Sequence, residues 1–116
     1  MVDGAGYFVP VSMTERAAGF AADELRADEY LRGMDRAMFV ARLAHHYDQF
    51  NYIHPFREGN GRAQRWMWDR IARDAGWRLN WLGVTGAVND AASRAAAEER
   101  DLQLLIAMLD QIVVPL

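Results

Sequence analysis

Apolar residues recur at helical spacing along most of this 116-residue chain, and that periodicity limits the fold more than any other feature. Stripes of this kind predict helices over residues 12–28, 35–52, 60–75 and 101–113, and an alanine-rich composition favours another over 85–97. The second stripe consists of Phe39, Val40, Leu43, Tyr47 and Phe50, and the last of Leu102, Leu105, Ile106, Leu109, Ile112 and Val113. The sequence therefore predicts an all-α fold.

The remaining elements are short. Only residues 6–11 look strand-like, and a lone strand needs a partner to form a sheet. The first helix should bury one face that consists of Met13, Ala17, Phe20, Ala21 and Leu25. Asp35 can cap the second helix and Asp101 the last, Gly76 suits the left-handed end of the third, and residues 77–81 should form an extended connection.

Composition excludes several classes of protein. Hydrophobic residues make up 52% of the chain, but charged residues interrupt every apolar run before it reaches the length of a bilayer span. The net charge of -3 provides no basic surface for nucleic acid, and there are no cysteines for disulfides or thiolate metal sites. The N-terminus lacks the pattern of a secretory signal. We expect one soluble, cytoplasmic domain without a direct nucleic-acid or membrane partner.

Residues 54–65 read His-Pro-Phe-Arg-Glu-Gly-Asn-Gly-Arg-Ala-Gln-Arg and carry most of the functional information. Pro55 disfavours helix at His54, so a loop should follow the second helix and the next helix should begin at Asn60 or Gly61. A helix N-terminus presents unpaired N–H groups and the positive end of its dipole, which bind anions. Gly59 and Gly61 would let phosphate oxygens approach the backbone. The segment predicts a phosphate-binding loop.

The charged residues of this loop suggest separate roles. Arg62 and Arg65 lie on neighbouring turns and can bind different phosphate groups through bidentate hydrogen bonds. Glu58 supplies the hard oxygen that Mg²⁺ prefers when it bridges phosphates. His54 has the pKa range of a general base near neutral pH. Asn60 can donate to a phosphate, Phe56 should anchor the loop, and Arg57 should point outward.

This segment matches every defined position of His-Pro-Phe-x-(Asp or Glu)-Gly-Asn-Gly-Arg-x-x-Arg, the signature of Fic domains. The chain resembles that family over most of residues 12–113. The resemblance implies a Fic-fold helical bundle, with residues 12–116 as the Fic core and residues 1–11 as a residual strand of the flap hairpin. The first flap strand and the preceding helical portion of the family are not seen in this sequence, so the missing strand puts target docking in question.

The resemblance also implies an activity, the transfer of AMP from ATP to a Tyr, Ser or Thr hydroxyl of a target protein. His54 would deprotonate that hydroxyl, and Glu58 would hold Mg²⁺ between the α- and β-phosphates. Gly59, Asn60 and Gly61 would line the anion site. Arg62 would contact the β-phosphate and Arg65 the γ-phosphate. ATP is thus the expected donor and Mg²⁺ the expected cofactor.

Regulation is expected to come from another protein. Many Fic proteins carry an inhibitory (Ser or Thr)-x-x-x-Glu-(Gly or Asn) helix, but Ser12, Thr14, Thr85 and Ser93 are followed four positions later by Arg16, Ala18, Asn89 and Ala97. The chain therefore resembles the class of Fic toxins and injected effectors that a separate small antitoxin inhibits. Type II topoisomerases are one candidate target. Translocation into a host cell and oligomerisation stay open.

Four alternatives are weighed at this point. The chain could be a catalytically silent nucleotide-binding or assembly module, or a transferase that uses UTP, GTP or CDP-choline. His45 and His46 could join His54 in a metal site, but an ordinary helical role is favoured because no ligand spacing supports a metal. The four tryptophans, Trp66, Trp68, Trp77 and Trp81, are interpreted as core or interface aromatics in preference to base-stacking residues.

Overall fold

The computed structural model describes residues 11–52 and 61–116, apart from the side chains of residues 11–15, 17, 18, 52 and 61–64. These ranges contain five α-helices and two short strands. The helices are α1 (Val11–Ala27), α2 (Arg36–Tyr52), α3 (Gly61–Asp74), α4 (Gly86–Glu99) and α5 (Gln103–Ile112). The predicted helical architecture is confirmed. The predicted strand at 6–11 lies outside the described residues except for Val11, which begins α1.

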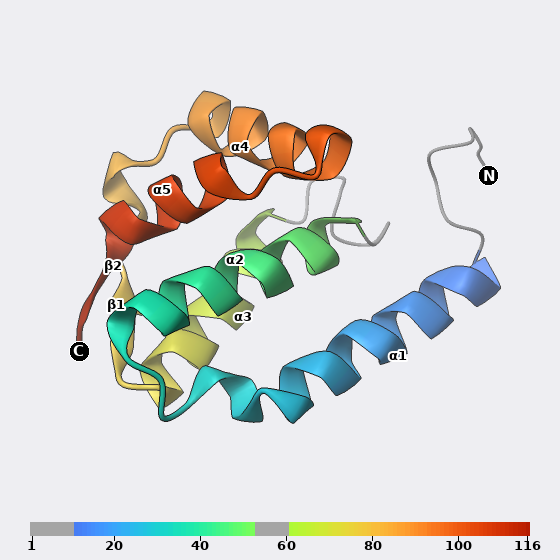
Figure 1. The fold of residues 1–116 in the computed structure, drawn as a ribbon, viewed down its shortest axis with the longest axis horizontal. Coiled ribbons are helices and arrows are strands. Elements are labelled where there is room, and N and C mark those ends of the chain that lie inside the picture. The colour runs from blue at the N-terminus through green and yellow to red at the C-terminus, as the bar shows by residue number, and fades with distance from the viewer. Residues whose placement is uncertain (1–10, 53–60) are drawn as a thin grey trace.

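Helix α2 occupies the centre of the molecule (Figure 1). Helix α1 packs along one side of it, and the antiparallel pair α4 and α5 packs against the other. Helix α3 follows the loop after α2 and contacts β1 (Trp77–Leu79). In sequence, the C-terminal end of α2 and the N-terminal end of α3 flank the segment that carries the motif.

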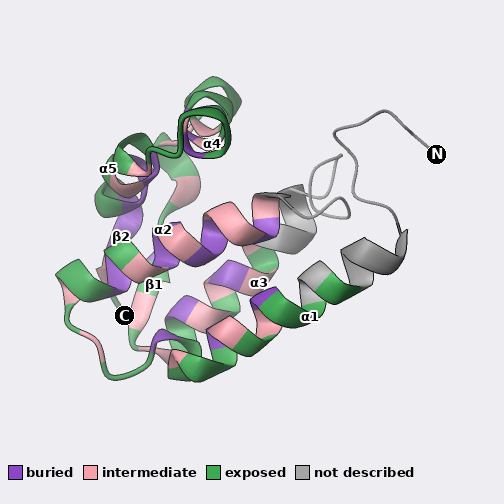
Figure 2. Cartoon of the chain, turned by 45° about the vertical axis from the view of Figure 1, so that its right-hand side comes forward, coloured by how far each residue is buried: buried purple, intermediate pink, exposed green. Residues whose placement is uncertain are grey.

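The core confirms the helical stripes. All five apolar residues of the predicted α2 stripe are buried, and Trp68 and Leu105 are fully buried from neighbouring helices. Figure 2 shows buried residues recurring along α2, whereas much of α4 is exposed. On α1, Ala21 and Leu25 are buried as predicted, but Phe20 is 60% exposed. The prediction for Phe20 is wrong because the described helices cover only the C-terminal part of α1.

A two-stranded sheet closes one end of the bundle. Strand β1 pairs antiparallel with β2 (Val113–Pro115), with Arg78 opposite Val114. The extended connection predicted over 77–81 is confirmed for Trp77–Leu79, whereas Trp81 begins a short helical turn. Val113, predicted as the last turn of a helix, belongs to a strand. Apolar residues at a helix end do not reveal that a partner strand lies far earlier in the chain, as Leu79 lies 34 positions before Val113. The expectation that only residues 6–11 look strand-like was therefore wrong.

Local capping follows the sequence closely. The Asp35 carboxylate accepts a hydrogen bond from the Met38 N–H at 2.8 Å. Thr85 caps α4 by accepting from the Val88 N–H at 3.1 Å. Asp101 accepts from the N–H of Gln103, the first residue of α5, at 3.0 Å. These side chains satisfy backbone donors that the first turn of a helix leaves unpaired.

The turn between α1 and α2 has an unusual backbone. Glu29, Tyr30 and Leu31 all have positive φ, between 54° and 67°. Left-handed geometry costs an L-residue about 1–2 kcal/mol, so tertiary contacts must hold this turn in place. Leu31 is one such contact, because its side chain is fully buried in the core.

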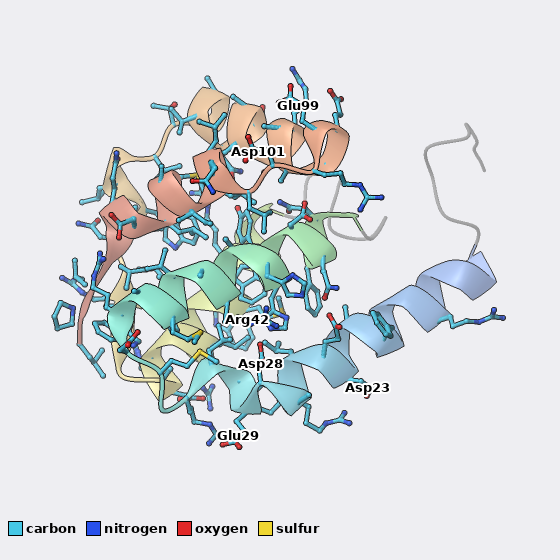
Figure 3. The ribbon with its side chains drawn as sticks, in the orientation of Figure 1. Asp23, Asp28, Glu29, Arg42, Glu99 and Asp101 are labelled. Carbon is cyan, nitrogen blue, oxygen red and sulfur yellow. The ribbon has the colours of Figure 1, made fainter. Side chains whose placement is uncertain are left out.

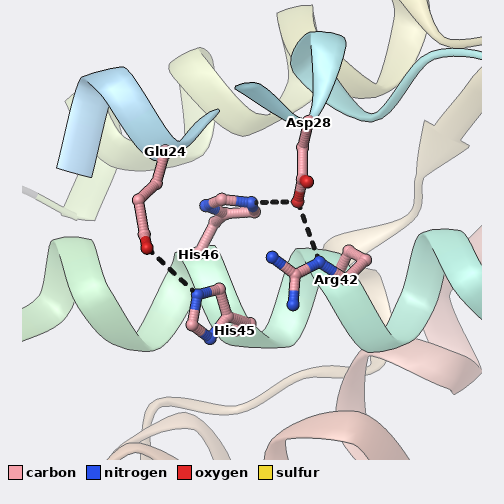
Figure 4. A network of polar contacts seen from close by, with 5 residues as sticks. All are labelled: Glu24, Asp28, Arg42, His45 and His46. Carbon is pink, nitrogen blue, oxygen red and sulfur yellow. Dashed lines mark hydrogen bonds and ion pairs between the residues drawn. The ribbon is translucent and has the colours of Figure 1, made fainter. Parts of the chain in front are cut away.

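A polar network beside this turn joins α1 to α2. Asp28 and Arg42 face each other between the two helices, whereas Asp23 and Glu29 point outward (Figure 3). The Asp28 carboxylate accepts from Arg42 Nε at 2.8 Å and lies 2.7 Å from His46 Nε2 (Figure 4). Burial alone would raise the pKa of Asp28, but the hydrogen bonds and charges of His46 and Arg42 outweigh it and lower that pKa.

Across residues 11–52 and 61–116, none of the helices combines the length and the apolar character that crossing a bilayer requires.

Candidate functional site

The motif lies, in sequence, at the junction between two described helices. Helix α2 ends at Tyr52 and α3 begins at Gly61. Of the predicted site residues, His54, Glu58, Gly59 and Asn60 lie outside the described residues. Gly61 and Arg62 form the first turn of α3, and Arg65 lies on the next turn with its side chain described.

The start of α3 at Gly61 has a direct chemical consequence. A 14-residue helix begins immediately after the Gly-Asn pair of the motif. Its first N–H groups have no partner within the helix, and its dipole places partial positive charge at this end. This end of α3 is therefore suited to bind an anion, and Arg62 and Arg65 lie on its first two turns.

The Arg65 side chain rests on an aromatic ring. Its guanidinium carbon lies 4.9 Å from the ring centroid of Trp81, a residue of the short helical turn η3 (Trp81–Gly83). No described carboxylate forms an ion pair with Arg65. Asp69, one turn later on α3, instead accepts the indole N–H of Trp81 at 2.8 Å. The cation is thus held by a neutral ring.

Side-chain hydrogen bonds fix the end of α2 that leads into the loop. Tyr47 donates to Asn89 Oδ1 at 2.9 Å, and Asn51 donates to Ser93 Oγ at 3.1 Å, so two successive turns of α2 are bonded to α4. Burial raises the pKa of Tyr47, and the nearby Arg65 charge partly opposes that shift. Tyr47 therefore stays protonated at neutral pH and lies close to the Arg65 cation.

Sequence reasoning missed Trp81 and Asp69 as neighbours of the site. Trp81 was interpreted as a core or interface residue, and it does pack against the core, but its indole face also contacts Arg65. Among the other tryptophans, Trp68 is fully buried and Trp77 is half-buried, as predicted, whereas Trp66 is 69% exposed. The spacing of 65, 69 and 81 held no sign of their contact, because Trp81 reaches α3 only through β1 and its turn.

The other two histidines belong to the α1–α2 interface. His46 contacts Asp28, and His45 Nε2 lies 3.3 Å from Glu24 Oε1 (Figure 4). The two carboxylates belong to Glu24 of α1 and to Asp28, the residue directly after α1. Their side chains therefore have a structural role between helices, in line with the interpretation made from sequence.

Comparison with known proteins agrees with this geometry. Residues 7–72 match the model of the Fic/DOC family. A probable protein adenylyltransferase Fic from Escherichia coli K12 is 36% identical over 90 residues, which cover 78% of this chain and 45% of that protein.

Solved structures show the same fold. The Fic domain of a VirB-translocated Bep effector from Bartonella quintana, solved with bound ADP, superposes with a TM-score of 0.87 at 26% identity, covering 98% of this chain and 55% of that one. BepC from Bartonella tribocorum, solved with bound AMPPNP, superposes with a TM-score of 0.88 at 22% identity, covering 99% of this chain and 56% of that one.

The chain spans about half the length of these relatives. The family match nevertheless includes α1, α2, the motif loop and most of α3, and the superpositions extend the likeness through α4 and α5. Since that family model covers more than half of the 116 residues, the chain belongs to the Fic/DOC family.

Proposed function

We propose that this chain is a protein adenylyltransferase core that transfers AMP from ATP to a hydroxyl side chain of a target protein. The observation that carries the proposal is the start of α3 at Gly61, directly after the His54-to-Asn60 part of the motif. That junction gives the loop a helix terminus suited to phosphate and places Arg65 on the next turn. Its relatives named as adenylyltransferases, and Fic domains solved with ADP, support a nucleotide as the ligand.

The proposed reaction is a nucleophilic displacement at the α-phosphorus. The target hydroxyl loses its proton to the His54 imidazole while its oxygen forms a new O–P bond. The bond between the α-phosphorus and the oxygen that bridges to the β-phosphate breaks, and pyrophosphate leaves with that electron pair. General-base catalysis of this type contributes roughly 10²- to 10⁴-fold to the rate.

In the proposed reaction, positively charged groups stabilise the negative charge of the phosphates. The N–H groups at the start of α3 and the guanidiniums of Arg62 and Arg65 would bind the β- and γ-phosphates, where negative charge accumulates on the leaving group. Glu58 would hold Mg²⁺, since one carboxylate together with substrate phosphates is the usual way in which proteins bind this ion. When bound, Mg²⁺ would neutralise phosphate charge.

Two labelled forms of ATP test the reaction. The chain is incubated with Mg²⁺, a bacterial lysate and ATP labelled either at the α- or at the γ-phosphate. We expect proteins to be labelled from α-labelled ATP alone, because the β- and γ-phosphates leave together. His54→Ala should lose the label, whereas His45→Ala, which changes a histidine of the α1–α2 interface, should retain it.

Each outcome has a clear reading. Equal labelling by the wild-type chain and His54→Ala would contradict the proposal, and label from γ-labelled ATP would indicate phosphoryl transfer. ATP binding without any labelling would identify a silent nucleotide-binding module. Repeating the reaction with α-labelled UTP and GTP determines the donor base.

We also propose that this activity belongs to a toxin that a separate antitoxin inhibits. In support, none of the four Ser and Thr residues of the sequence is followed four positions later by glutamate. Expression of the wild-type chain in bacteria should then slow growth, and His54→Ala should not. Equal growth with both would contradict the toxin role without affecting the labelling result.

A further inference from the structure

The contact between Arg65 and Trp81 joins two elements that are not neighbours in sequence. Arg65 lies on the second turn of α3, and Trp81 lies in η3, beyond β1. The guanidinium carbon is 4.9 Å from the indole centroid, within the range of a cation–π interaction. Tryptophan is the most effective of the aromatic partners for such a contact.

The indole is itself held in a defined orientation. Its Nε1–H donates to Asp69 Oδ1 at 2.8 Å, and Asp69 lies one helical turn after Arg65 on α3. Asn80 caps η3 by accepting from the Leu82 N–H at 3.2 Å, and its own N–H donates to the carbonyl of Ile112 at 2.8 Å. Helix α3 therefore supplies both the cation on the face of the ring and the acceptor at its edge.

The type of partner matters for an arginine that must bind phosphate. A carboxylate would occupy the N–H groups along the edge of the guanidinium and would compete with the ligand for them. An aromatic ring contacts only the flat face and leaves those N–H donors free. Among the residues that the structure describes, no carboxylate pairs with Arg65, so none of them competes for its N–H donors while the ring orients the side chain.

We propose that Trp81 is a positioning residue of the nucleotide site, which holds the Arg65 guanidinium so that its N–H edge meets the terminal phosphate of a nucleoside triphosphate. This inference rests on the proposed function. The resemblance to Fic domains implies that Arg65, one turn farther into α3 than Arg62, contacts the γ-phosphate. Trp81 acts only through Arg65, and its loss should affect the γ-phosphate alone.

Comparing ATP with ADP isolates that phosphate. We expect Trp81→Leu to weaken ATP binding by about 5-fold, the effect of a cation–π contact of ordinary strength, and to change ADP binding by less than about 2-fold. Trp81→Phe, which keeps an aromatic face but loses the bond to Asp69, should give an intermediate loss for ATP. In an Arg65→Ala background, Trp81→Leu should have no further effect on ATP.

Trp77→Leu is the matched control. Trp77 is also a half-buried tryptophan, but it lies in β1 and stacks on Phe39 with centroids 5.8 Å apart. Its replacement should lower stability and leave the ratio of ATP to ADP affinity unchanged. Binding is measured by isothermal titration of the whole chain, after circular dichroism has confirmed that each variant is folded.

The results separate this inference from the proposed function. If the wild-type chain prefers ATP and both folded Trp81 variants keep that preference, the positioning role is overturned alone. An equal loss of ATP and ADP affinity would also overturn it, because a general structural effect would then explain the change. A wild-type chain that binds neither nucleotide overturns the proposed nucleotide site and this inference together.

Discussion

Acidification should weaken the packing of α1 against α2 through one buried residue, His46. Its side chain is fully buried, and its Nε2 lies 2.7 Å from the Asp28 carboxylate. Its other ring nitrogen, Nδ1, has no hydrogen-bond partner among the described residues. Burial lowers the pKa of His46 more than the hydrogen bond and charge of Asp28 raise it. The folded protein therefore holds His46 neutral, with Nε2–H donating to Asp28.

The sign of the pH dependence follows from proton binding. The unfolded chain protonates His46 near its ordinary pKa of 6.5, and the folded protein does so only at lower pH. Between these two values the unfolded state binds more protons, so stability falls as the pH drops below 6.5. The loss is limited to about 1.4 kcal/mol per pH unit, or about 2 kcal/mol between pH 6.5 and pH 5. A domain of this size typically has a stability of about 5–15 kcal/mol, so the change is measurable.

The comparison uses His46→Gln, whose amide can still donate to Asp28 but does not titrate. The free energy of unfolding is measured in urea from pH 7 to pH 5 by tryptophan fluorescence. The wild-type chain should lose more stability over this range than His46→Gln does. His45→Gln, which removes the adjacent and less buried histidine, should keep the dependence that His46 contributes.

The titration of nearby carboxylates does not produce the same pH dependence of stability. Burial raises the pKa of Asp48, so its protonation favours the folded state at acid pH, opposite in sign to His46. Hydrogen bonds from Gln49 and His45 lower the pKa of Glu24, and the stability it contributes is lost only at more acid pH. Both groups are present in all variants and largely cancel in the difference. Parallel curves for the wild-type chain and His46→Gln would refute the reasoning.

Two further predictions concern the framework, each measured by urea unfolding. Arg36→Met removes the bonds from the start of α2 to Asp110 at the end of α5 and should lower the free energy of unfolding by about 1 kcal/mol. Arg26→Met, which removes an exposed ion pair within α1, should leave the urea midpoint unchanged. Gly76→Ala should lower stability by about 1–2 kcal/mol because φ is +94° there; nothing crowds the added methyl, so the cost comes from the backbone alone. Conversely, Glu29→Gly should raise stability by up to about 1 kcal/mol, because glycine adopts the positive φ of that position without strain. A stabilising Gly76→Ala or a destabilising Glu29→Gly would show that those backbone angles do not limit stability.

Most of the helical framework could be predicted because its determinants are local. The stripe from Phe39 to Phe50 has helical spacing, and Asp35 and Thr85 cap helices by accepting from N–H groups three positions later. The candidate site could be located for the same reason. Its helix begins at Gly61, where Pro55 and the glycines of the loop predict a break and a restart.

The misplaced elements depend on partners far along the chain. Val113 extends the apolar pattern of α5 and would fit another helical turn, yet it pairs with Leu79 in the sheet. Phe20 fits the stripe of α1, but no described element covers that part of the helix. Apolar periodicity predicts which residues of a helix can face a core, but it does not predict how far along the helix the core extends.

By itself, the sequence determined the helices and the chemistry that the motif can offer, because backbone propensity and side-chain spacing act over a few residues. Only the tertiary structure decided that Trp81 meets Arg65, that Asp28 meets His46, and that residues 29–31 take left-handed backbone angles. Each of these features depends on packing between elements that are distant in sequence. Such packing orients the Arg65 guanidinium, and it holds residues 29–31 in a backbone conformation that local preferences disfavour.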